Sequence, residues 1–134
     1  MRILVIEDSR FLRIAIERTL TKAGHSVIGV EDGHEGLQAA RTNLPALILL
    51  DMMLPGMEGT AVLKELKNDA STAHIPVIVL TGLSQKNAQK LKDAGAAAYI
   101  EKSSIDFVQN ANALLEIVGS VLGCEKAASA AAHA

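Results

Sequence analysis

The sequence predicts a doubly wound α/β domain, in which helices cover both faces of a five-stranded parallel sheet. Short apolar runs of strand length alternate with segments of helical apolar spacing, five times along the chain. The run Leu47–Leu50 has no polar interruption, which is typical of a strand that is buried on both faces. The 134 residues suit one domain, and neither a linker nor an internal repeat divides them.

Turn and capping residues separate the expected elements. We expect strands at Ile3–Ile6, Ser26–Val30, Leu47–Leu50, Ile75–Leu80 and Ala97–Ile100. We expect helices from Ser9 to Gly24, over Gly33–Thr42, over Thr60–Asn68, from Ser84 to near Gly95, and after Ser103 or Ser104. Asp32 with Glu35 resembles a capping box at the start of the second helix. Residues 1–122 are therefore expected to form the domain, and the Ala-rich tail 123–134 is expected to be disordered.

Composition excludes several classes of function. Aromatic residues make up only 2% of the chain, so Ile, Leu, Val, Ala and Met must build the core. The net charge of −2 predicts no direct nucleic-acid partner, and no apolar run reaches the length of a membrane span. The lone Cys124 cannot form an internal disulfide, and the N-terminus lacks the features of a signal peptide. These observations predict a cytoplasmic protein.

Polar side chains follow four of the expected strands at the point where each strand ends. They are Glu7–Asp8, Asp51, Thr81 and Lys102. The carboxyl ends of parallel strands share one edge of a sheet, and ligands bind at that edge. Three carboxylates exceed the single positive charge of Lys102, so a hard divalent cation is expected, and Mg²⁺ suits such oxygen ligands. A carboxylate beside Mg²⁺, a lysine and a hydroxyl can accept a phosphoryl group.

In these motifs the chain resembles response regulator receiver domains, from Met1 to about Leu122. The motifs are the acidic pair Glu7–Asp8, the Asp-x-x-x-Pro-Gly segment that starts at Asp51, Thr81 followed by Gly82, and Lys102 after the last strand. The resemblance implies a flavodoxin-like fold with the strand order 2-1-3-4-5. It also implies a single-domain, chemotaxis-receiver-like phosphoprotein of two-component signal transduction, phosphorylated by a histidine kinase or a histidine phosphotransfer protein and read by an unidentified downstream partner.

The same resemblance implies a role for each site residue. Asp51 resembles the phosphoacceptor, and Asp8 resembles the direct Mg²⁺ ligand. Asp51 and the Met53 carbonyl resemble further ligands, and Glu7 would hold metal-bound water. Lys102 would pair with the phosphoryl group, Thr81 would move to bind it, and Tyr99 resembles the aromatic residue that reports the switch. Such a protein catalyses its own phosphorylation and dephosphorylation but is not a metabolic enzyme.

The sequence departs from the family pattern at two positions. Glu7 occupies a position where aspartate is also common, and Ser103 replaces the usual proline after the lysine. The Lys102–Ser103 peptide is therefore expected to be trans.

One alternative function is an interaction module that works without phosphorylation. The other is a phosphatase with an aspartyl-phosphate intermediate, like haloacid dehalogenases. Such enzymes need an acid/base aspartate where this chain has Met53.

Overall fold

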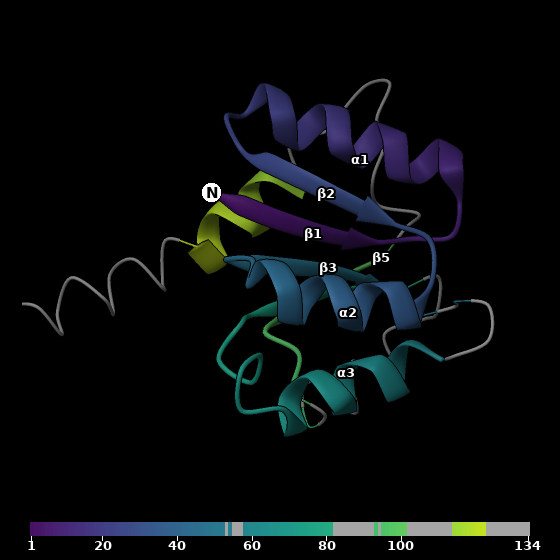
Figure 1. The fold of residues 1–134 in the computed structure, drawn as a ribbon. Coiled ribbons are helices and arrows are strands. Elements are labelled where there is room, and N and C mark those ends of the chain that lie inside the picture. Colours follow the sequence, from purple (N-terminus) through teal and green to yellow (C-terminus); the bar gives the residue numbers. More distant parts are fainter. Residues whose placement is uncertain (53, 55–57, 82–92, 94, 102–113, 123–134) are drawn as a thin grey trace, which may run out of the picture.

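A computed structural model describes residues 1–52, 54, 58–81, 93, 95–101 and 114–122. Five strands pair in parallel in the order β2-β1-β3-β4-β5 (Figure 1). The strands are β1 (Arg2–Ile6), β2 (Ser26–Val30), β3 (Leu47–Asp51), β4 (Val77–Thr81) and β5 (Ala98–Glu101). The helices with both ends among the described residues are α1 (Arg10–Lys22), α2 (Gly33–Asn43) and α3 (Gly59–Asn68). Residues 114–122 are also helical. The predicted fold class and strand order are confirmed.

The sheet separates two apolar cores, because successive side chains of a strand point to opposite faces. One core packs under α2 and α3, and the other packs under α1 and the helical residues 114–122. Figure 1 shows α1 on one side of the sheet and α2 and α3 on the other. Every residue of β3 and β4 is buried, which confirms the interpretation of Leu47–Leu50 as a central strand.

The predicted caps are present, with one difference in detail. The Ser9 side chain accepts a hydrogen bond from Leu12 N at the start of α1, and Asp32 accepts one from Glu35 N at 2.8 Å. The reciprocal bond of a capping box would run from Asp32 N to the Glu35 carboxylate. Instead, Glu31 N donates to Glu35 Oε2 at 3.5 Å. The Glu35 side chain thus secures the residue before the cap.

Several boundaries differ from the prediction by one or two residues. Asp51 is the last residue of β3 rather than the first after it, and β4 begins at Val77, after Pro76. Proline has no N–H to donate to a sheet ladder, so the later start of β4 is physically reasonable. The expectations for the helix after Ser84, the start of the last helix, the Lys102–Ser103 peptide and the tail 123–134 lie outside the described residues.

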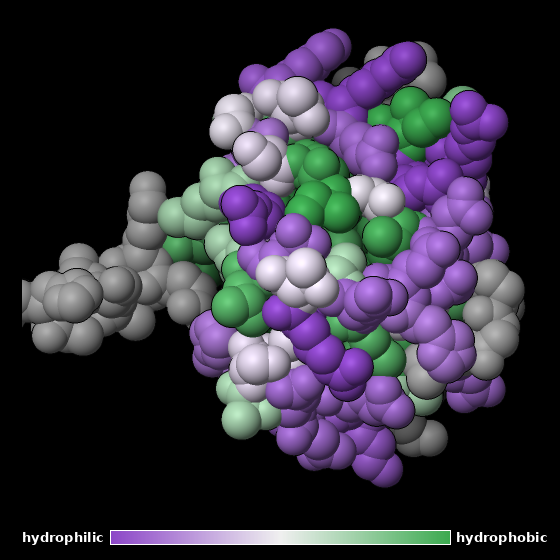
Figure 2. All heavy atoms as spheres, viewed as in Figure 1, coloured by the Kyte–Doolittle hydropathy of each residue, from purple (hydrophilic) through white to green (hydrophobic). Residues whose placement is uncertain are grey.

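The surface seen in Figure 2 is largely hydrophilic, with smaller apolar areas between the polar side chains. Among the described residues, the structure has no helix with the length and hydropathy that crossing a membrane requires.

Gly59 packs directly against the main chain at the end of β3. It is the first residue of α3, and its N–H donates to Met52 O at 3.0 Å. A Cβ atom at this position would lie 2.5 Å from Met52 Cα and 2.6 Å from Asp51 O. These are backbone atoms, so they can yield only if the end of β3 moves. The absence of a side chain at Gly59 therefore allows α3 to approach the residue that ends the central strand.

We expect Gly59→Ala to destabilise the fold by about 1–3 kcal/mol, as overpacking usually does. Gly119→Ala is the matched control, because a Cβ there meets nothing within 4 Å and the residue is helical. Replacing a helical glycine by alanine should stabilise the chain by about 0.5–1 kcal/mol. Urea unfolding of both variants measures the two effects. Equal free energies of unfolding for Gly59→Ala and the wild type would contradict the packing argument.

Candidate functional site

The register of the central strands brings the predicted acids together. Ile6 of β1 lies beside Leu50 of β3, so Glu7 and Asp51 follow at the same edge of the sheet. Glu7, Asp8 and Asp51 each contribute one carboxylate oxygen to a group of atoms that all lie within 4.8 Å of one another. Glu7 and Asp51 are buried, whereas Asp8 is exposed. The acidic cluster, as we call these three residues, is therefore open to solvent on one side.

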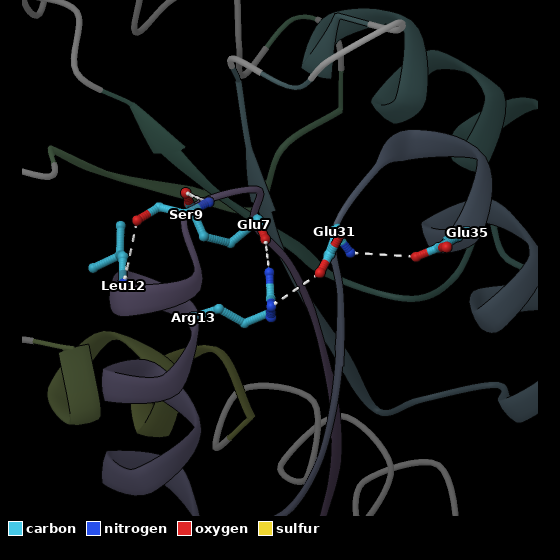
Figure 3. Close-up of polar contacts among 6 residues, drawn as sticks. All are labelled: Glu7, Ser9, Leu12, Arg13, Glu31 and Glu35. Carbon is cyan, nitrogen blue, oxygen red and sulfur yellow. Dashed lines mark hydrogen bonds and ion pairs between the residues drawn. The ribbon is translucent and has the colours of Figure 1, made fainter.

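Hydrogen bonds to neighbouring elements hold Glu7 in place. Its N–H donates to Val30 O at 3.1 Å, which extends the pairing of β1 with β2. Its Oε1 accepts from Ser9 N at 3.1 Å, and its carbonyl oxygen accepts from Arg13 Nη1 at 2.8 Å (Figure 3). The residue that begins the acidic cluster is thus tied to β2, to the start of α1 and to the second turn of α1.

The acidic cluster has the chemistry of a site for a hard cation. All three ligating groups are carboxylates, and two of them are buried side by side. Glu7 Oε2 and Asp51 Oδ2 are buried oxygens that accept no hydrogen bond in the described part of the chain, although both residues make other polar contacts. Adjacent buried negative charges are unfavourable unless a cation offsets them. The residues present therefore fit Mg²⁺, which prefers oxygen ligands.

The remaining predicted site residues divide into two groups. Thr81 ends β4 and is 3% exposed, and Asp51 pairs with its neighbour Leu80. Tyr99 lies on β5 opposite Val79, and it packs against the same core as Val79. Because Thr81 is two residues beyond Val79, strand alternation places Thr81 and Tyr99 on one face of the sheet. Met53 and Lys102 lie outside the described residues.

Two residues that support the site were missed in the sequence. They are Gly59, the first residue of α3, and Arg13, in α1. The Arg13 side chain is only 12% exposed. A polar residue that borders an apolar helical stripe one turn after the cap is the available signal for such a contact. Its partner, a main-chain carbonyl, leaves no mark in the sequence.

A comparison with protein families agrees with this geometry. The family model of the response regulator receiver domain matches residues 3–118. The chain belongs to this family. The receiver domain is 35% identical over 102 residues to Protein PilH of Pseudomonas aeruginosa, covering 75% of this chain and 84% of that protein. It is 37% identical over 102 residues to the polar-differentiation response regulator DivK of Brucella anthropi, with 75% and 82% covered.

Other relatives carry a similar receiver within a much longer protein. The match to histidine kinase P4 of Formosa agariphila is 38% identical over 102 residues, which is 75% of this chain but 7% of that protein. The match to the response regulator PleD of Caulobacter vibrioides spans only 22% of that protein. Receiver domains of this type therefore occur both nearly alone and as parts of longer chains.

Solved structures show the same fold. Chemotaxis protein CheY4 of Vibrio cholerae superposes with a TM-score of 0.80 at 27% identity, covering 90% of this chain and 97% of that one. The receiver domain of sensor histidine kinase PA1611 from Pseudomonas aeruginosa gives a TM-score of 0.78 at 25% identity, with 91% and 97% covered. The PA1611 structure has a magnesium ion coordinated in its active-site cleft.

We expect Asp8→Asn to weaken Mg²⁺ binding more than Glu7→Gln does. Asp8 is exposed at the open side of the acidic cluster, whereas Glu7 already accepts a hydrogen bond from Ser9 N. Loss of a group that only supports metal ligands costs about 10–100-fold in affinity, and loss of a direct ligand should cost more. Titration calorimetry with MgCl₂ measures both losses. Equal losses, or a larger loss for Glu7→Gln, would reject the assignment of Asp8 as the direct ligand.

Proposed function

We propose that this receiver domain accepts a phosphoryl group on Asp51, with Mg²⁺ bound by the acidic cluster. The observation that carries the proposal is the convergence of Glu7, Asp8 and Asp51 at the carboxyl edge of the sheet. A bound Mg²⁺ would offset the charge of these acids and of the phosphoryl oxygens. In the proposed assignment Asp8 and Asp51 ligate the ion directly with the Met53 carbonyl, and Glu7 orients a metal-bound water.

The proposed donor is a phosphohistidine of a histidine kinase or a histidine phosphotransfer protein. An Asp51 carboxylate oxygen attacks the phosphorus, and an acyl-phosphate P–O bond forms while the P–N bond of the donor breaks. The imidazole leaves with the electron pair of that bond and takes up a proton. Lys102 is proposed to pair with the transferred group, whose charge must be balanced throughout the step. The PA1611 structure supports magnesium as the metal, since that domain has the same fold.

The proposed output is a two-state change that a downstream protein reads. Thr81 and Tyr99 share one face of the sheet on neighbouring strands, so a movement of one can change the space available to the other. A phosphoryl group that hydrogen-bonds the Thr81 hydroxyl would favour one of the two states. We further propose that the receiver spans residues 1–122 and acts in the cytoplasm, where its phosphodonors are expected.

Phosphoryl incorporation should disappear in Asp51→Asn, because an amide cannot act as the nucleophile. The wild type should gain one phosphoryl group from a small phosphodonor in the presence of Mg²⁺, and chelation of the metal should prevent this gain. Intact-protein mass spectrometry under non-acidic conditions measures both outcomes. Phosphorylation that persists in Asp51→Asn would refute the assignment, and a wild type that never gains the group would favour the phosphorylation-independent module.

Thr81→Ala should still accept the phosphoryl group but should lose the change that follows. The chain has one tyrosine and no tryptophan, so intrinsic fluorescence reports the surroundings of Tyr99 alone. Phosphorylation should shift this fluorescence in the wild type and in Thr81→Ser, which keeps the hydroxyl. The shift should be absent in Thr81→Ala. A wild-type shift in Thr81→Ala would mean that its hydroxyl has no part in the switch.

A further inference from the structure

We propose that Arg13 is a positioning residue for the acidic cluster and sets the affinity of the cluster for its cation. The inference rests on the proposed function, because it takes the cluster to be the Mg²⁺ site. Arg13 itself touches neither the cation nor the phosphoryl group. It acts through the main chain between two of the acids.

The contact that carries the inference is the hydrogen bond from Arg13 Nη1 to Glu7 O at 2.8 Å. Figure 3 shows the guanidinium reaching from α1 to the end of β1. This carbonyl belongs to the peptide that joins Glu7 to Asp8. The bond therefore restrains the peptide plane, which contains the Cα atoms of both acids. Val30 O restrains the N–H of Glu7, and Ser9 N restrains its carboxylate. Without Arg13, the Glu7–Asp8 peptide loses this hydrogen bond to its carbonyl oxygen.

The Arg13 side chain is largely buried, and its neighbours leave space for it to reach the Glu7 carbonyl. The side chain is 12% exposed, so the guanidinium has given up most of its hydration and depends on its acceptors. Gly29 of β2 provides the space, because a Cβ there would lie 3.1 Å from Arg13 Cδ and would clash with Glu17 Oε1. The planar fork of a guanidinium can also serve two acceptors at once.

The second acceptor of Arg13 is weak. Arg13 Nη2 lies 3.4 Å from Glu31 Oε1, and the Glu31 side chain is 70% exposed. Exposed ion pairs of this kind contribute little, because water screens them. The bond to the Glu7 carbonyl should therefore account for the effect of Arg13 on Mg²⁺ affinity. Removal of the Glu31 carboxylate should leave that affinity almost unchanged.

Electrostatics and positioning predict opposite signs for the loss of Arg13. A cation near three carboxylates repels Mg²⁺, so removal of its charge alone should tighten Mg²⁺ binding. Loss of the restraint on the Glu7–Asp8 peptide should weaken binding, since the ligands are no longer held in place. The sign of the change in affinity therefore separates the two roles.

The test compares Mg²⁺ dissociation constants by titration calorimetry. We expect Arg13→Gln to weaken Mg²⁺ binding about tenfold, the lower end of the range for groups that orient metal ligands. Arg13→Lys should recover most of the affinity, because the ammonium can still donate to the carbonyl. Arg10→Gln is the charge-matched control: Arg10 is exposed on the first turn of α1, and its side chain makes no hydrogen bond or ion pair with the described residues. Arg10→Gln and Glu31→Gln should each change affinity by less than about twofold.

A second measurement tests the contact directly, in case Arg13→Gln also lowers the stability of the fold. The ¹³C chemical shift of the Glu7 carbonyl, recorded without metal, should move in Arg13→Gln and stay near the wild-type value in Arg13→Lys. Mg²⁺ binding to Arg13→Gln that equals or exceeds that of the wild type would overturn the positioning role while leaving the proposed function intact. A wild type that does not bind Mg²⁺ would overturn the proposed metal site, and the inference with it.

Discussion

The structure depends on the pairing of β1 with β3, because this register decides which residues meet at the carboxyl edge of the sheet. Both strands are buried and almost wholly apolar, and their side chains alternate between two separate cores. A slip of one residue would turn the side chains of the slipped strand to the opposite core and would separate Glu7 from Asp51. The free energy of apolar burial therefore holds the acids together, although the acids themselves repel one another. Polar chemistry at the edge thus depends on largely apolar packing beneath it.

The edge combines two kinds of restraint. Gly59 brings α3 against the Asp51–Met52 main chain, where only a glycine leaves enough space. On the other side, hydrogen bonds from Ser9 and Arg13 connect Glu7 to α1, and β2 holds its N–H. Asp51, the acid of β3, is thus positioned by close packing, and Glu7, the acid that follows β1, by hydrogen bonds. The packing of Gly59 and the hydrogen bonds to Val30 O and from Arg13 act on the main chain, whereas Ser9 N binds one carboxylate oxygen of Glu7.

Much of this could be read from the sequence, for physical reasons that differ between residues. Uninterrupted apolar runs predicted the strands because burial on both faces demands them, and the acids at their ends predicted the cluster because parallel strands share one edge. The role of Arg13 could not be predicted, since a main-chain acceptor is the same at every position. Gly59 was equally silent, because a glycine that allows close packing looks like one that makes a turn. The bond from Glu31 to Glu35 depends on how the chain enters α2, which a capping pattern describes only approximately.

A switch of the proposed kind needs one part of the site that stays still while another part moves. The β1 side meets the first requirement, since the N–H, the carbonyl and one carboxylate oxygen of Glu7 are all engaged. Thr81 and Tyr99 lie on β4 and β5, two and three strands away from β1, and Tyr99 is only partly buried. If Thr81 closes on a phosphoryl group at Asp51, the accompanying rearrangement is therefore expected on the β5 side of the site rather than on the β1 side. Any flexibility added at Glu7, for example by loss of the Arg13 contact, would let the acids adjust instead and would reduce the part of the change that reaches Tyr99.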